Sequence, residues 1–189
     1  MLSNEAAQAL LMLIAKQDQS AFVAFYREMS RSIYVFSLNQ LKNAADSEDV
    51  VVETMHEVWR CAVRFRGESK VSTWVLGIAR NKLLMKLRAR RDTSVDVDEL
   101  SETLASESPD PDELIAAAQQ AKEVGRCMQK LSVVHRECLH LTFFEDMSVA
   151  EVARLQQVPE GTVKTRLFHA RQKIKLCLAN LLRGVNVAL

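Results

Sequence analysis

Residues 147–183 read MSVAEVARLQQVPEGTVKTRLFHARQKIKLCLANLLR and decide how this part of the chain folds. Ser148 and Glu151 form a capping box, a pattern that begins a helix because each side chain accepts a hydrogen bond from the other residue's backbone N–H. That helix is predicted to end before Val158, since a residue that precedes proline avoids helical conformation. Pro159 then suits the first turn of a second helix. The stretch therefore predicts a helix-turn-helix: a short helix, a break and a long helix.

The second of these helices is expected to separate apolar from polar side chains. At about 100° per residue, one stripe faces inward and consists of Val163, Leu167, Ala170, Ile174 and Leu181. The opposite side carries Lys164, Thr165, Phe168, His169, Arg171, Gln172 and Lys175. No acidic residue occurs between Gly161 and the C-terminus, so the polar side is basic along its whole length.

Two interpretations of this polar side are open. Polar and basic residues on a helix commonly form only a solvated face. Phe168 favours the other interpretation, because a phenyl group in the middle of a polar face gains nothing from contact with water. In a DNA major groove the same ring would meet thymine methyl groups, while lysine and arginine side chains would meet phosphates. We therefore expect the second helix to read duplex DNA.

The distribution of charge divides the chain into blocks. With 189 residues, 48% apolar and 26% charged, the composition is that of a globular protein with room for two small domains. The net charge of +1 is an average over blocks of opposite sign. From Arg80 to Arg91 six basic residues occur without an acid, and from Asp92 to Glu113 nine acids occur without a base. Residues 92–112 are therefore predicted to form a flexible acidic linker.

The sequence contains no signal for a membrane, a leader or a metal. No apolar run approaches the length that spans a bilayer, and the N-terminus has neither a basic leader nor a cleavage site, so we expect a cytoplasmic protein. His135, Cys138 and His140 cluster, but their spacing matches no standard zinc arrangement, and neither a metal nor a cofactor is expected. We expect reduced, buried thiols at the four cysteines, which form no Cys-x-x-Cys pair: Cys61, Cys127, Cys138 and Cys177.

Helical periodicity runs through the chain, and strand-like alternation is nowhere sustained. Five glycines and three prolines leave few turns, so an all-α fold follows, with two small helical domains. Four helices are expected before the linker. They are a short helix containing Leu10 to Ile14, one from Ala21 to about Leu41, one from an Asp46 N-cap to about Phe65, and one from about Ser72 to about Arg91.

The third of these helices is expected to expose two neighbouring rows of side chains. Its buried stripe is Val50, Thr54, Val58, Cys61 and Phe65. An acidic row follows at i, i+4 and i+8, formed by Asp49, Glu53 and Glu57, and an apolar row beside it is formed by Val52, His56 and Trp59. Together the two rows predict a docking surface for a basic protein partner. The alternative is that the first helix simply covers Trp59.

The fourth helix is expected to bury Leu76, Ala79, Leu83 and Leu87. Trp74, Asn81 and Arg88 share another face at a spacing of seven residues, next to Gly77. A glycine at that place would let another backbone approach closely. We expect Trp74 itself to be packed in the core, because other apolar side chains, Ile78 and Met85, share its side of the helix.

Two long motifs resemble those of a known family. The run DSEDVVVETMHEVWR from Asp46, followed by FRGESKVSTWVLGIARNK from Phe65, resembles region two of the extracytoplasmic-function sigma factors of bacterial RNA polymerase. The stretch from MSVAEVA through PEGTVKTRLFHAR is similar to their region four. Both motifs occur in the family's order and together cover nearly the whole chain. This conjunction is far more specific than a helix-turn-helix alone.

The resemblance implies a division into region two over residues 1–91, a linker over 92–112 and region four over 113–189. In the family, region two docks on the clamp coiled coil of the beta-prime subunit of RNA polymerase core, and region four contacts the flap of the beta subunit. The residues that match the docking helix are Asp49, Val52, Glu53, His56 and Trp59. The family would also lead us to expect an anti-sigma factor as a partner.

The resemblance further implies two contacts with promoter DNA. The minus-ten element is read as an unpaired strand, for which the matching residues are Arg80, Asn81, Lys82 and Arg88. By analogy Asn81 would hydrogen-bond a flipped base. The minus-thirty-five element is read in the major groove, for which the matching residues are Lys164, Thr165, Phe168, His169, Arg171 and Lys175. A sigma factor that directs promoter-specific initiation is the function this sequence predicts.

Other classes of function explain less of the sequence. A helix-turn-helix regulator that acts without polymerase leaves residues 46–91 without a purpose. A helical interaction protein with no role on DNA leaves Phe168 and the two basic helices unexplained. No enzyme is expected, because none of the four histidines has a plausible serine or cysteine partner in sequence.

Overall fold

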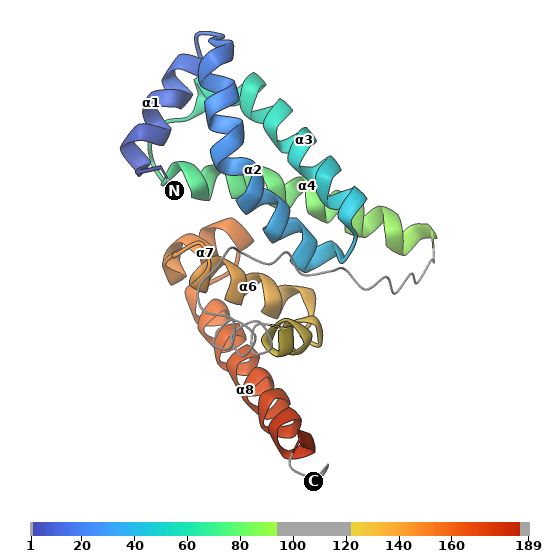
Figure 1. Ribbon diagram of the computed structural model, residues 1–189. Coiled ribbons are helices and arrows are strands. Elements are labelled where there is room, and N and C mark those ends of the chain that lie inside the picture. Colours follow the sequence, from blue (N-terminus) through green and yellow to red (C-terminus); the bar gives the residue numbers. More distant parts are fainter. Residues whose placement is uncertain (1, 94–121, 186–189) are drawn as a thin grey trace, which may run out of the picture. The chain divides into compact units, whose positions relative to one another are not determined.

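The computed structural model describes residues 2–93 and 122–185, and within these two ranges every regular element is a helix (Figure 1). The predicted all-α fold is therefore confirmed. The chain divides into two compact units, which separate near residue 100. From residue 94 onward, the predicted acidic linker lies outside the described residues.

The first unit is a set of helices around one core. Its elements are α1 (Asn4–Ile14), α2 (Gln19–Leu41), α3 (Ala44–Cys61), the 3₁₀ turn η1 (Ala62–Arg64) and α4 (Val71–Thr93). Each of α2, α3 and α4 packs against the other two, and α1 packs mainly against α2 and η1 (Figure 1). The core combines large side chains from all these helices, including Leu11, Phe25, Phe36, Val50, Val58, Leu76 and Leu83.

The start and the end of α3 differ from the prediction. The N-cap is Asn43, whose Oδ1 accepts a hydrogen bond from the backbone N–H of Asp46 at 2.9 Å. Asp46 is therefore in the first turn, where a carboxylate still favours the positive end of the helix. An asparagine is as good an N-cap as an aspartate, and here the asparagine comes first in the chain. The α-helix ends at Cys61, because the chain tightens into the 3₁₀ turn before reaching Phe65.

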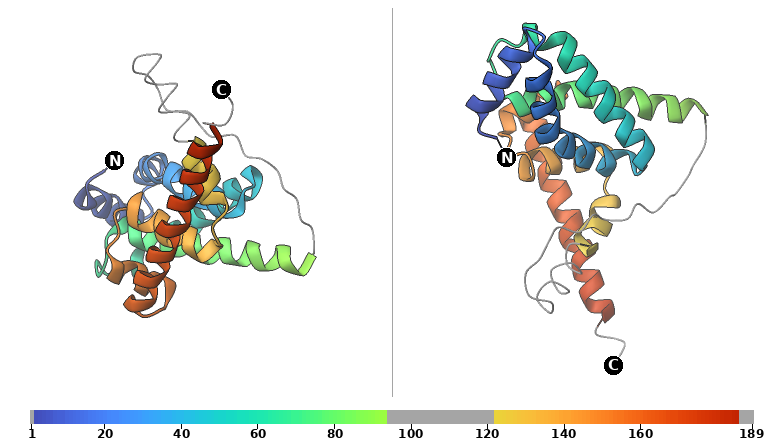
Figure 2. Two further views of the ribbon diagram at one scale, coloured as in Figure 1. Left: turned by 90° about the horizontal axis from the view of Figure 1, so that it is seen from below. Right: turned by 45° about the horizontal axis from the view of Figure 1, so that its top comes forward.

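The second unit is built along one long helix. After a helical segment at residues 122–129 come α6 (Val133–Phe143), α7 (Val149–Gln156) and α8 (Glu160–Val185). Both α6 and α7 pack against α8, which is much longer than either (Figure 2). Up to residue 181, the buried side chains of α8 are Val163, Leu167 and Ala170, while Ile174 and Leu181 are half-buried. This is the inward stripe that the periodicity predicted.

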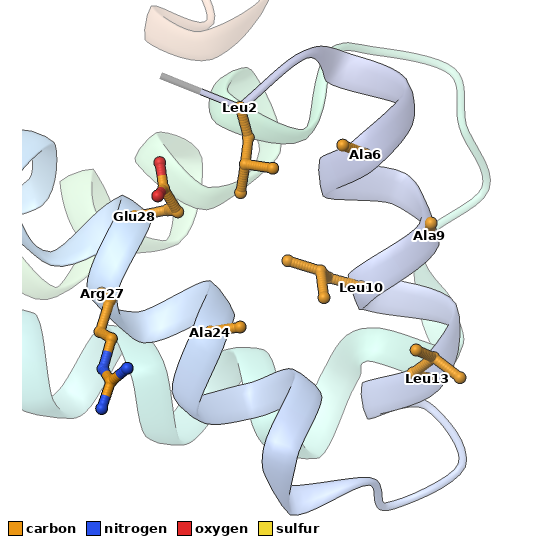
Figure 3. Close-up of a pocket in the computed structure, with 8 residues that line it drawn as sticks. All are labelled: Leu2, Ala6, Ala9, Leu10, Leu13, Ala24, Arg27 and Glu28. Carbon is orange, nitrogen blue, oxygen red and sulfur yellow. The ribbon is translucent and has the colours of Figure 1, made fainter.

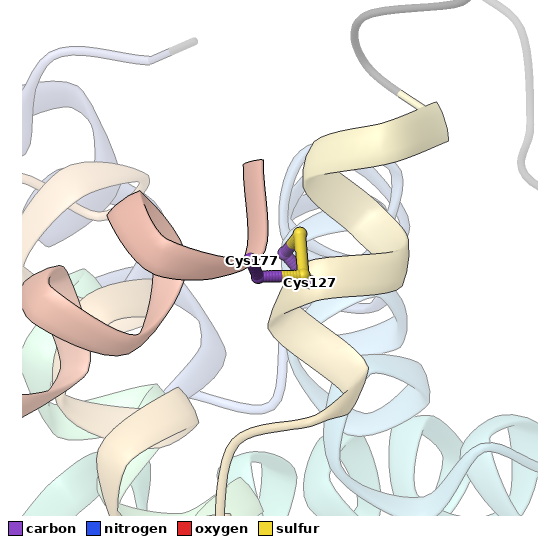
Figure 4. The surroundings of a disulfide bond; sticks show 2 residues. All are labelled: Cys127 and Cys177. Atoms are coloured by element: carbon purple, nitrogen blue, oxygen red, sulfur yellow. A yellow bond between two sulfur atoms is a disulfide. The ribbon is translucent and has the colours of Figure 1, made fainter. Parts of the chain in front are cut away.

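One expectation about the cysteines is wrong. Cys127, in the helical segment before α6, and Cys177, in α8, form a disulfide with a Cα–Cα distance of 5.8 Å (Figure 4). They lie 50 residues apart in sequence, so only the packing of that segment against α8 brings them together. The other two cysteines are free thiols, half-buried at Cys61 and buried at Cys138.

Candidate nucleic-acid and partner interfaces

The helix-turn-helix forms as the sequence predicts. Ser148 Oγ accepts from the backbone N–H of Glu151 at 3.2 Å, and a carboxylate oxygen of Glu151 accepts from the backbone N–H of Ser148 at 2.9 Å. The first helix stops at Gln156 because Gln157 adopts a left-handed conformation with φ of 56°. Its N–H then closes the last turn of α7, and α8 begins directly after Pro159.

The polar side of α8 is exposed. All seven side chains predicted to lie there are exposed, namely Lys164, Thr165, Phe168, His169, Arg171, Gln172 and Lys175. Phe168 exposes 59% of its surface, as much as Phe143 and Phe144 of the same unit, although large aromatic side chains are usually buried. An apolar ring thus lies in the middle of a basic surface.

Two members of this surface are held by neighbouring groups. The guanidinium of Arg171 lies over the ring of Phe143, 5.1 Å from its centroid, in a cation–π arrangement between α8 and α6. The hydroxyl of Thr165 donates to the carbonyl of Gly161 at 2.9 Å, within α8 itself. Beside them the rings of Phe168 and His169 meet edge to face at 5.5 Å. Arg171 is therefore partly fixed in direction before it meets any ligand.

A buried polar network joins the three helices of this motif, and the sequence analysis missed it. Gln156 of α7 donates to Glu137 of α6 at 2.8 Å and accepts from Arg166 of α8 at 2.7 Å. The thiol of Cys138 donates to the same Gln156 oxygen at 3.3 Å. Both Glu137 and Gln156 are more than nine-tenths buried. A glutamine at the end of a helix carries no sequence signal of burial, so only the packed structure reveals it.

On α4 the residues predicted to bind an unpaired strand lie at or near the surface. Asn81 and Arg88 are exposed, whereas Arg80 and Lys82 are half-buried. A Cβ added at Gly77 would meet nothing within 4 Å, so this part of the helix is open, as predicted.

The environment of Trp74 is less enclosed than predicted. Trp74 is half-buried and packs on Phe65, with ring centroids 5.4 Å apart. Met85 was expected on a packed side of α4, but 63% of its surface is exposed. At this level α3 packs on the opposite side of α4, where Leu83 is buried and Lys86 contacts Asp49, so the side that carries Met85 is left uncovered.

The acidic row on α3 faces cations of α4. Lys86 Nζ lies 2.9 Å from Asp49 and 3.9 Å from Glu53, and Lys82 Nζ lies 3.8 Å from Glu53. Burial alone would lower the pKa of Lys86, but the hydrogen bond to Asp49 and the charges of Asp46 and Glu53 outweigh it and raise this pKa. The side chains of Asp49 and Glu53 remain 63% and 46% exposed. They are therefore still accessible to a partner.

The third acid of the row has different neighbours. Glu57 accepts a hydrogen bond from the thiol of Cys61 at 2.9 Å and forms an ion pair with Arg60 at 3.6 Å. The Cys61 hydrogen bond, more than any other cause, lowers the pKa of Glu57. Glu57 thus has its contacts within α3, whereas Asp49 and Glu53 have theirs with lysines of α4.

The apolar row of α3 borders a groove. Its volume is about 390 Å³, and its lining residues come from α2 and α3: Gln19, Phe22, Tyr26, Val52, Met55, His56 and Trp59. Trp59 is half-buried, and Phe22 of α2 meets it edge to face at 5.1 Å. The alternative in which the first helix covers Trp59 is therefore wrong, since α2 provides the aromatic contact. Val52 and His56 are exposed at the rim.

A second apolar groove lies between α1 and the first half of α2, away from every residue that the sequence analysis selected (Figure 3). Its volume is about 520 Å³, and Leu10 of α1 points toward Ala24 of α2 across it, while Leu13 also lines it. At one end of this groove lie a positively charged side chain, Arg27, and a negatively charged one, Glu28.

The residues considered for a metal site have separate partners. His140 lies 3.3 Å from Glu145 and stacks on Phe144, whereas Cys138 belongs to the polar network around Gln156. His135 contacts Ser132 through its Nδ1 atom at 2.7 Å. In the described parts of the chain, no group of three potential ligands converges, and no helix is long and apolar enough to cross a membrane.

Comparisons with known proteins agree with this architecture. Residues 25–93 match the family Sigma-70 region 2, and residues 121–174 match the family Sigma-70, region 4. A curated relative, the ECF RNA polymerase sigma factor SigK of Mycobacterium tuberculosis, is 26% identical over 179 residues, which span 90% of this chain and 92% of that protein. The RNA polymerase sigma-H factor of Pseudomonas aeruginosa is 27% identical over 191 residues, 97% of this chain and 99% of that protein.

Solved structures share the fold. The sigma factor RpoE from Bartonella quintana, in complex with the anti-sigma factor NepR, superimposes with a TM-score of 0.68 at 21% identity, covering 82% of this chain and 97% of that one. CnrH in complex with the cytosolic domain of CnrY gives a TM-score of 0.64 at 22% identity, and the match covers 93% of this chain and 98% of CnrH. These structures show the same fold, and the two family matches place the chain in the class of sigma factors.

Within that class, the chain belongs to the extracytoplasmic-function (ECF) group. The activity of this family is promoter-specific initiation of transcription, and its members are regulators rather than enzymes.

Proposed function

We propose that this ECF sigma factor binds RNA polymerase core through α2 and α3 and reads the two promoter elements with α4 and α8. The proposed boundaries are region two at residues 1–91, the linker at 92–112 and region four at 113–189. It would act in the cytoplasm, where the polymerase and the promoter are found. An anti-sigma factor is a further proposed partner, because RpoE and CnrH were solved with NepR and CnrY.

The proposed polymerase surface combines charge with an apolar groove. Asp49 and Glu53 present partly exposed carboxylates, and the groove beside them is bordered by Val52, His56 and Trp59. An amphipathic basic element, such as the beta-prime clamp coiled coil, would place apolar side chains in the groove and cations on the acids. Its cations must compete with Lys82 and Lys86, which already neutralise part of the row. Region four would contact the beta flap.

The proposed promoter contacts divide between the units. Asn81 on α4 would capture an unpaired base of the minus-ten element, with Arg80, Lys82 and Arg88 on phosphates. The residues of α8 that would enter the DNA major groove at the minus-thirty-five element are Lys164, Thr165, Phe168, His169, Arg171 and Lys175. The observation that carries the proposal is the exposed side of α8, where the apolar side chains of Phe168 and Leu176 lie among lysine and arginine residues and no acid follows Glu160. Duplex DNA offers that combination of apolar and anionic contacts.

Charge reversal at the acidic row tests the polymerase contact. The double variant Asp49→Lys and Glu53→Lys should fail to assemble with core polymerase, because like charges would then face each other at the interface. Its helicity should persist, but its thermal stability should fall modestly, because the variant loses ion pairs worth at most about 1 kcal/mol each and places the new lysines beside Lys82 and Lys86. A matched control, Glu5→Lys with Glu28→Lys, reverses the same number of exposed charges away from the acidic row and its groove. Co-migration of the first variant with core polymerase at the wild-type level would refute the proposed surface.

A further inference from the structure

A basic pocket lies next to the exposed side of α8. His135 of α6 forms one wall, and most of the rest comes from the first turns of α8, including Thr162, Thr165, Arg166 and His169. The pocket has a volume of about 480 Å³, and none of its lining residues is acidic. His135, Thr162 and Arg166 are not among the residues that the sequence analysis selected for DNA binding.

The pocket occupies one edge of the surface proposed to enter the major groove. At about 100° per residue, Thr165 and Gln172 lie near the centre of the exposed side of α8. Lys164 and Lys175 then fall on one edge, and Arg166 and Lys173 fall on the other. A major groove is bordered by phosphates on both sides, roughly 12 Å apart. A helix centred in that groove therefore needs phosphate-binding groups on both edges, and the pocket with His135 provides the second.

His135 is placed to respond to an anion. It is half-buried, its Nδ1 lies 2.7 Å from the hydroxyl of Ser132, and its ring centroid is 6.5 Å from that of His169. Burial first, and then the positive charges of Lys173, His169 and Arg166, lower the pKa of His135. No carboxylate opposes these effects. The imidazole is thus mostly neutral at neutral pH until a negative charge enters the pocket.

We propose that this pocket binds a backbone phosphate of the distal promoter duplex and that His135 takes up a proton from solvent as it binds. The proton-bearing Nε2 would donate to a phosphate oxygen, while Nδ1 keeps its contact with Ser132. The phosphate charge would also meet Arg166 and Lys173. This inference rests on the proposed function of α8, because it requires duplex DNA along the exposed side of that helix.

Protonation of His135 and binding of the phosphate should each favour the other. A phosphate stabilises the protonated ring, so the pKa of His135 is higher in the complex than in the free protein. Promoter affinity then increases as the pH falls through the pKa of the complex, and it levels off below the pKa of the free protein. Each unit by which the two pKa values differ corresponds to about a tenfold change in affinity.

The test compares promoter binding at about pH 6 and pH 8, on either side of the usual range of histidine titration. Holoenzyme is assembled from core polymerase and the full-length chain, and its affinity for a labelled promoter duplex is measured by fluorescence anisotropy at constant ionic strength. His135→Gln keeps a polar side chain that cannot titrate, and His135→Lys supplies a permanent charge. Val134→Gln is the control, because Val134 is exposed on the same turn but does not line the pocket.

We expect the ratio of affinities between the lower and the higher pH to be several-fold larger for wild type than for His135→Gln, since one unit of pKa shift sets a ceiling of about tenfold that is reached only below the pKa of the free protein. His135→Lys should bind tightly at both pH values, which a merely structural role of the histidine would not produce. Val134→Gln should behave as wild type. Neutral methylphosphonate groups in place of the phosphates that flank the distal element should remove the extra pH dependence of the wild-type protein.

Equal pH dependence in wild type and His135→Gln overturns the inference, and so does an excess pH dependence of wild type over His135→Gln that survives methylphosphonate substitution. A uniform loss of affinity at both pH values in both His135 variants would show a structural role only. A different result would contradict the proposed function itself. If α8 does not read DNA, Phe168→Ala should bind the distal element as tightly as wild type does. Circular dichroism of each variant establishes that it is folded before its binding is interpreted.

Discussion

The disulfide between Cys127 and Cys177 should carry a large share of the stability of the second unit. A cross-link between residues 50 apart lowers the entropy of the unfolded chain, and the loop-closure relation gives about 4 kcal/mol for this separation. For a domain of this size, that loss corresponds to a decrease in Tm of roughly 20 °C. The variant Cys177→Ser, or reduction of the wild-type protein, should produce this decrease in the second unit alone.

Hydrogen exchange read by mass spectrometry measures the effect in each unit separately. Amides of α6 and α8 should lose protection when dithiothreitol is added to wild type, while amides of α2 and α3 serve as the internal control. Cys61→Ser removes a thiol from the first unit and should leave the response to reductant unchanged. The reasoning is refuted if oxidised protein, verified by mass to contain the disulfide, shows the same protection of α8 with and without reductant.

Two further predictions concern DNA. Phe168→Ala and Lys164→Ala should each weaken binding to a promoter that carries its distal element, by about 1–3 kcal/mol if the side chain touches a base edge. Only Lys164→Ala should also reduce the salt dependence of binding, since only it removes a charge, and unchanged binding in both variants would contradict the groove-facing role of α8. Asn81→Ala should leave core binding intact but impair promoter opening, and the defect should ease on a template already mismatched across the start region. Permanganate reactivity measures the opening, and wild-type levels on both templates would rule out base capture by Asn81.

Features that depend on near neighbours in the chain were predictable from the sequence. The capping box at Ser148 and the buried stripe of α8 follow from spacings of three and four residues, which a helix converts directly into contacts and faces. The exposure of Phe168 followed from the same periodicity. Even the error at Asp46 is local, because Asn43 can cap the helix equally well and lies nearer the preceding turn.

Features that join distant parts of the chain were decided by tertiary structure. The Cys127–Cys177 bond, the polar network around Gln156 and the pocket beside His135 each bring together side chains from different helices. The same holds for Lys86, which lies on α4 and neutralises acids of α3. Periodicity gives the face of a helix on which a residue lies, but it carries no information on which other helix packs there. That choice depends on how all the apolar stripes are buried at once, which is a property of the packed core.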